Sequence, residues 1–122
     1  MRKISFVFAY KFLSSDSLNE VYSGKHWRYR REYAAGVHMF VKNALNKAKA
    51  STFEMFNKKV KITLTFPLDG VDIDNHAYFG KCVVDALKGV LIKDDSPKYV
   101  RGFSLLFDER EDVLVEVEEL AS

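Results

Sequence analysis

The chain has 122 residues, and its 48% hydrophobic content is enough for the core of one compact domain. Charged residues make up 30% of the chain but leave a formal net charge of only +2, which is too small to indicate nucleic-acid binding by itself. The single cysteine, Cys82, excludes an intramolecular disulfide and a zinc site made of thiolates. No apolar run is long enough to span a bilayer, so we expect one soluble, cytoplasmic domain, 1–122, without membrane contact.

The first half of the chain predicts two strands separated by one long helix. Alternating apolar side chains at 4–8 predict the first strand. At about 30–50, apolar residues recur at helical spacing and predict an amphipathic helix. Alternation returns at 60–66 and predicts a half-buried strand that stops at Pro67.

The second half predicts a helix followed by two strands. The side chain of Asp74 or Asn75 can accept hydrogen bonds from free amides at a helix start, and this helix is expected to run to Lys88. Strands are predicted at 99–107 and 113–117, joined by a polar hairpin. The order strand, helix, strand, helix, strand, strand predicts an α+β fold with two main helices.

Two aspartates, Asp72 and Asp74, lie one residue apart after the second strand. If strand geometry continues there, both carboxylates point to one side while Ile73 points to the other. Neighbouring carboxylates repel, and a divalent cation offsets that repulsion directly. Oxygen ligands suit Mg²⁺ or Mn²⁺, with Asp94 and Asp95 as further ligand candidates if the second helix brings its following loop back.

Ordinary backbone chemistry offers another interpretation of both acidic motifs. Asp, Asn, Ser and Pro favour turns and helix caps, so 72–75 can be a turn with a cap and 94–97 a solvated turn. Both motifs are short and common, and spacing alone leaves the two interpretations open.

The order of the motifs is more specific than any one of them. Asp72-Ile73-Asp74-Asn75 is followed by Lys81, by Asp85-Ala86-Leu87 and by Asp94-Asp95. This order resembles the D-x-D-N, lysine, D-A-L and D-D pattern of the RusA family of Holliday-junction resolvases. Upstream, 17–22 looks like the family's S-x-N-x-x-Y segment, so the resemblance covers most of the chain.

The resemblance implies a RusA-like single domain with a mixed sheet, often prophage-encoded, that forms a homodimer and cuts four-way branched DNA. Its cofactor would be Mg²⁺, with Mn²⁺ able to substitute. Asp72, Asp74 and Asp95 match the family's essential acidic positions, and Lys81 matches its catalytic lysine. Asp94 is a supporting ligand candidate. A homodimer would present two equivalent sites to two symmetry-related strands.

Lys81 departs from the family pattern, in which the lysine lies about one helical turn beyond the second aspartate. Here it lies further along the chain, directly after Gly80. If the helix is regular, Lys81 and Asp74 still share a face. If Gly80 breaks the helix, the placement of Lys81 is open.

A basic, aromatic stretch precedes the first helix. Its candidate phosphate-binding residues are Lys25, Arg28, Arg30 and Arg31. The interleaved Trp27 and Tyr29 can stack on unpaired bases near a junction centre. The alternative is a solvated helix start with Trp27 in the core.

Three further residues have mainly structural interpretations. Asp85 lies four residues after Lys81, which predicts a helical salt bridge. His76 is a candidate proton carrier, although a surface histidine is the expectation that the sequence favours. Cys82 lies in an apolar helix and is expected to be a buried small hydrophobe rather than a nucleophile.

We therefore expect a Mg²⁺-dependent endonuclease that hydrolyses branched DNA. The alternative from another class is a non-catalytic DNA-binding or phage-associated protein that keeps the same fold, which the displaced Lys81 favours. A third interpretation, a small-molecule or calcium-binding domain, predicts no salt-sensitive affinity for DNA.

Overall fold

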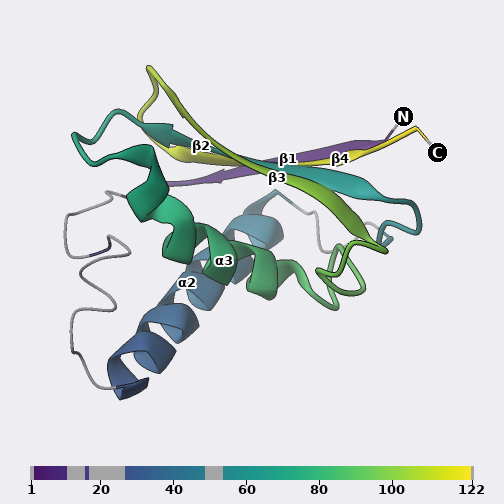
Figure 1. The fold of residues 1–122 in the computed structure, drawn as a ribbon, viewed down its shortest axis with the longest axis horizontal. Coiled ribbons are helices and arrows are strands. Elements are labelled where there is room, and N and C mark those ends of the chain that lie inside the picture. The colour runs from purple at the N-terminus through teal and green to yellow at the C-terminus, as the bar shows by residue number, and fades with distance from the viewer. Residues whose placement is uncertain (1, 11–15, 17–26, 49–53, 122) are drawn as a thin grey trace.

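The computed structural model describes residues 2–10, 16, 27–48 and 54–121. These residues form a sheet with two helices packed on one of its faces (Figure 1). The strands are β1 (Lys3–Phe8), β2 (Val60–Pro67), β3 (Val100–Asp108) and β4 (Val113–Glu119). The helices are α2 (Trp27–Lys47) and α3 (Ala77–Leu87), and a short 3₁₀ helix, η3 (Ile73–His76), leads directly into α3. No described helix is long and apolar enough to cross a membrane.

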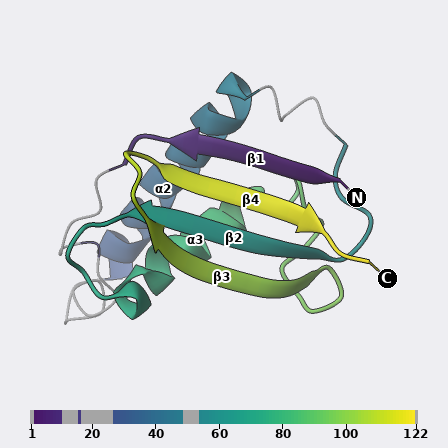
Figure 2. The same ribbon diagram turned by 90° about the horizontal axis from the view of Figure 1, so that it is seen from above.

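The strand order in the sheet is β1-β4-β2-β3, as Figure 2 shows from above. β2 and β3 are parallel neighbours because α3 carries the chain back between them, whereas β4 runs antiparallel to both β1 and β2. The sheet is therefore mixed. This confirms the α+β class and the predicted order of strands and helices.

The hairpin predicted at 108–112 is wrong. β4 does not pair with β3 but lies between β1 and β2, with Val115 opposite Phe6 on one side and Leu64 on the other. Its valines are fully buried, and a central place in the sheet buries them better than an edge would. Polar turn residues predict where a strand ends, but they do not predict which strand the chain joins next.

The core lies between the helices and the covered face of the sheet. β2 is the central contributor, and Ile62, Leu64 and Phe66 have no exposed surface. α2 and α3 contribute Val41 and Phe79, which are also fully buried. Because β2 is held on both sides by strands and from below by helices, the segment that follows Pro67 starts from a rigid base.

Candidate functional site

The acidic motif lies on the connection between β2 and α3, not on a strand. β2 ends at Pro67; Asp72 precedes the first turn of η3, and Asp74 lies within that turn. The predicted strand geometry, with both carboxylates on one side of an extended segment, is therefore wrong. Both residues are exposed.

The predicted cap of the second helix is also wrong. The residue before α3 is His76, and neither His76 nor Asp72 makes a side-chain hydrogen bond as a helix cap. Backbone groups close the turn instead: the amide of Asn75 donates to the Asp72 carbonyl oxygen at 3.1 Å. Within the described part of the chain, the carboxylates of Asp72 and Asp74 have neither a hydrogen-bond donor nor a cation partner.

A buried histidine holds this turn from the inside. His76 has no exposed surface, and its ring packs against Phe66 and Phe107, with ring centroids 4.5 and 5.2 Å away. Its Nδ1 lies 3.0 Å from the Asp72 carbonyl oxygen, and its Nε2 lies 2.7 Å from Asp69 Oδ2. The expectation of a surface histidine is wrong, because the 3₁₀ turn directs this ring into the core.

Hydrogen-bond chemistry fixes one proton of the His76 ring. The Asp72 carbonyl only accepts, so Nδ1 of His76 must carry a proton and donate it. The short contact between Nε2 and Asp69 Oδ2 holds the ring at its second nitrogen. The His76 ring therefore holds both Asp69 and the backbone of Asp72 in the connection 69–76, which we call the acidic turn.

The sequence contains part of the signal for this pair. Asp69 is followed by Gly70, whose φ of 77° is a left-handed conformation that favours glycine. Asp69 Oδ1 accepts a hydrogen bond from the Val71 amide at 3.0 Å, which is the usual aspartate turn. The turn is predictable from Asp-Gly, but the pairing with His76 depends on how the chain folds back.

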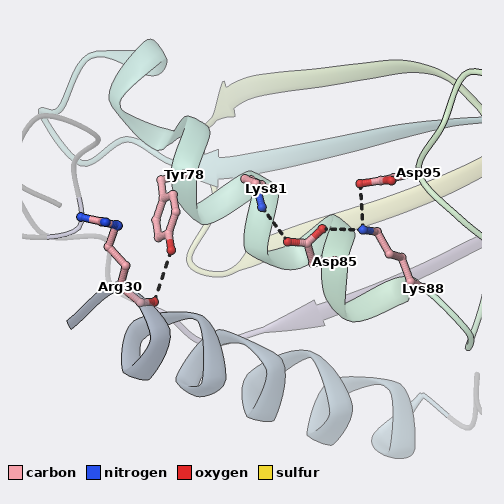
Figure 3. A network of polar contacts seen from close by, with 6 residues as sticks. All are labelled: Arg30, Tyr78, Lys81, Asp85, Lys88 and Asp95. Atoms are coloured by element: carbon pink, nitrogen blue, oxygen red, sulfur yellow. Dashed lines mark hydrogen bonds and ion pairs between the residues drawn. The ribbon is translucent and has the colours of Figure 1, made fainter. Parts of the chain in front are cut away.

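A row of alternating charges follows the outer side of α3 (Figure 3). Lys81 Nζ lies 2.9 Å from Asp85 Oδ2, which confirms the predicted helical salt bridge. Asp85 also pairs with Lys88 at 3.1 Å, and Lys88 Nζ reaches Asp95 Oδ2 in the next loop, also at 3.1 Å. Lys88 was not among the predicted site residues, although its position three residues after Asp85 is a pairing distance on a helix.

These ion pairs shift the pKa values of their members. The hydrogen bond from Lys81 to Asp85 raises the pKa of Lys81, and the contacts with Asp95 and then Asp85 raise that of Lys88. Burial acts to raise the pKa of Asp85, but its hydrogen bonds from Lys81 and Lys88 outweigh burial and hold the pKa below its ordinary value. Lys81, Asp85 and Lys88 are therefore charged at neutral pH.

Gly80 does not break the helix. It lies inside α3, and an added Cβ would stand 2.7 Å from Cζ of Phe103 on β3, so glycine permits the close approach of helix and strand. Lys81 consequently lies on the outer side of a continuous helix, with 65% of its side chain exposed. The family pattern has its lysine about one helical turn beyond the second aspartate. At that place this chain has Tyr78, which is buried.

The predicted metal ligands are not gathered into one group. Asp94 and Asp95 are exposed on the loop between α3 and β3, and Asp95 is paired with Lys88. Among the described residues, no three His, Cys, Asp or Glu side chains lie so that they could hold a metal ion together. Asp72 and Asp74 fit the smaller donor set that Mg²⁺ often uses, one or two protein carboxylates completed by water and phosphate oxygens.

The basic segment lies at the start of α2, beside the start of α3. Arg28 and Arg31 are exposed and Arg30 is half-buried, whereas Lys25 and the side chain of Trp27 lie outside the described residues. The Tyr78 hydroxyl donates to the Arg30 carbonyl oxygen at 3.2 Å, and Figure 3 shows the Arg30 side chain beside the Tyr78 ring. This contact links the arginine segment to the helix that follows the acidic turn.

Cys82 has the predicted structural role. Its side chain is buried on the inner side of α3, with 2% exposed. Burial raises the pKa of the thiol to about 11, so it is protonated at neutral pH and is a poor nucleophile.

Two comparisons with known proteins found no match. No protein-family model matches the chain, and no curated protein matches it. The resemblance to RusA resolvases therefore stays a prediction that depends on the order of short motifs.

Proposed function

We propose that this protein is a Mg²⁺-dependent endonuclease of the RusA type, which hydrolyses a phosphodiester bond in four-way branched DNA. The observation that supports this most is the state of Asp72 and Asp74: two exposed carboxylates without partners in the described chain, on a turn fixed by the buried His76. Exposed carboxylates that no cation neutralises are available to a divalent metal ion, which often takes only one or two protein carboxylates.

In this proposal Asp72 and Asp74 hold the metal, whose bound form would polarise the scissile phosphate and lower the pKa of a coordinated water. Lys81 stabilises the negative charge that develops on the phosphate. It is exposed and can exchange its bond with Asp85 for one with a phosphate oxygen. Arg28 and Arg31 offset the charge of the DNA backbone from the adjoining start of α2.

A homodimer would suit this substrate, because resolution of a junction requires cuts in two symmetry-related strands. A twofold dimer presents two equivalent sites to those strands. Asp94 and Asp95 would then act as supporting residues, with Asp95 able to join the metal only after it leaves Lys88.

A second candidate function is a non-catalytic DNA-binding protein with the same fold. The ion pairs favour it, because Lys81 and Asp95, two of the four residues to which the resemblance assigns catalysis, are each paired with an opposite charge. In that case the arginines at the start of α2 would bind DNA while the acidic turn would have only a structural role.

Incubation of a synthetic four-way junction with the protein and Mg²⁺ separates the two candidates. The nuclease proposal expects paired cuts near the junction centre, lost in Asp74→Asn, which keeps or improves binding because a repulsive charge is gone. Glu54→Gln is the matched control, since it removes one exposed carboxylate elsewhere. Binding without cleavage by the unaltered protein would favour the second candidate, and unchanged cleavage by Asp74→Asn would overturn the proposed metal site.

A further inference from the structure

A basic pocket lies at the end of the sheet opposite the acidic turn. Its cavity has a volume of about 380 Å³, and its lining residues are Asn57, Lys58, Lys59, Lys98, Tyr99 and Leu120. The pocket adjoins the start of β2, whereas the acidic turn follows its end. At about 3.3 Å per residue, the length of β2 separates the two by roughly 25 Å.

The parallel pairing of β2 and β3 brings the lysines together. Lys58 and Lys59 directly precede β2, and Lys98 and Tyr99 directly precede β3, so both pairs reach the same end of the sheet. Backbone hydrogen bonds fix the junction: the Val60 amide donates to the Tyr99 carbonyl at 2.9 Å, and the Leu120 amide donates to the Lys59 carbonyl at 2.8 Å. Backbone hydrogen bonds therefore hold the three segments that line the pocket against one another.

The described residues give this pocket no paired carboxylate. None of its lining residues is acidic, and within the described residues no carboxylate pairs with Lys58, Lys59 or Lys98. The ammonium group of Lys98 lies over the Tyr99 ring instead, 5.6 Å from its centroid. Three lysines therefore line one pocket that has no acidic lining residue, and this arrangement favours an anion.

We propose that this pocket binds one nucleotide unit of a DNA strand, with the lysines on a phosphate and the nucleoside against the wall formed by Tyr99 and Leu120. The volume is within the range of small-ligand sites, and its mixture of cationic and apolar lining suits a nucleotide better than a bare anion. The choice of DNA as the ligand rests on the proposed function. The pocket would contact a strand about seven nucleotides from the acidic turn, at 3.4 Å per nucleotide.

Two-dimensional ¹H–¹⁵N NMR spectra of the full chain test the proposal, with a 5′-phosphorylated thymidine dinucleotide as the probe. We expect saturable shifts of the backbone amides at 57–59, 98–99 and 120. In Lys58→Gln/Lys98→Gln the dissociation constant should rise roughly tenfold, as expected for lost hydrogen bonds to a charged group. The control Lys42→Gln/Lys47→Gln, with equal loss of charge on α2, should bind as the unaltered chain does.

The outcomes separate this inference from the proposed function. Dinucleotide shifts at the pocket without junction cleavage would support the pocket and contradict the nuclease. Cleavage without pocket shifts would do the opposite. Equal shifts with inorganic phosphate at the same concentration, or equal weakening in the α2 control, would overturn the assignment of a nucleotide site.

Discussion

His76 Nε2 and Asp69 Oδ2 lie 2.7 Å apart, with the His76 side chain fully buried and that of Asp69 9% exposed. Because the same imidazole also holds the Asp72 carbonyl, the pair determines the backbone from which Asp72 and Asp74 project. The turn is thus anchored to β2 through Phe66, and its exposed carboxylates are not what holds it in place.

His76→Ala should therefore destabilise the fold strongly. It removes both hydrogen bonds, leaves a cavity between Phe66 and Phe107, and leaves the Asp69 carboxylate, which is only 9% exposed, without its partner. Breaking a buried pair of this kind costs about 3–5 kcal/mol, a large share of the stability of a small domain. Urea unfolding followed by circular dichroism measures the loss.

His38→Ala, at an exposed position on α2, is the control and should change the free energy of unfolding by less than about 0.5 kcal/mol. Similar losses in the two variants would contradict the anchoring role.

Mg²⁺ should raise the melting temperature of the unaltered chain, because a ligand that binds only the folded state stabilises it. Asp72→Asn and Asp74→Asn should each abolish most of that rise, because each removes one proposed metal ligand. Differential scanning fluorimetry with increasing MgCl₂ is a sufficient measurement, with Glu54→Gln as the charge-matched control. A rise that persists in both aspartate variants would place the cation away from this turn.

Much of the fold could be predicted because hydrophobic periodicity is a local property. The alternation in β2 and the helical repeat in α2 both correspond to observed elements. The place of β4 between β1 and β2 could not be predicted in that way, since pairing is decided by total burial across distant segments.

In the candidate site, too, contacts set by local geometry were predictable and contacts between distant segments were not. The Lys81–Asp85 bond follows from helix geometry and was predictable. The buried state of His76 was not, because it depends on a 3₁₀ turn after Gly70 and on two aromatic rings from different strands. The spacing of Lys88 from Asp85 fits a helical pair, but its contact with Asp95 was not predictable, because Asp95 lies beyond the end of the helix.

Asp85→Asn should lower stability by up to about 1 kcal/mol, the usual range for exposed pairs, and the loss should depend on pH. The pKa of Asp85 is lowered from 3.8, so its contribution is present above that value and disappears as the pH falls through the lower, folded pKa. The pKa values of Lys81 and Lys88 are raised from 10.5, so their contribution is present below that value and disappears as the pH rises through the folded pKa. Urea midpoints of the two proteins should differ most between about pH 5 and 9 and converge at both extremes. A difference that is independent of pH would assign the loss to packing instead.

Gly80→Ala and Gly36→Ala should have opposite effects, although both replace a glycine inside a helix. At Gly36 on α2 an added Cβ meets nothing within 4 Å, so alanine gains helix propensity and should stabilise by up to about 1 kcal/mol. At Gly80 the Cβ would stand 2.7 Å from Phe103 Cζ and 3.2 Å from Leu105 Cδ2, so α3 or the Phe103 ring must shift. Overpacking costs about 1–3 kcal/mol, which exceeds the gain in propensity.

Thermal unfolding of the two variants measures the difference. If Gly80→Ala were as stable as Gly36→Ala, the close contact between α3 and β3 would not be required.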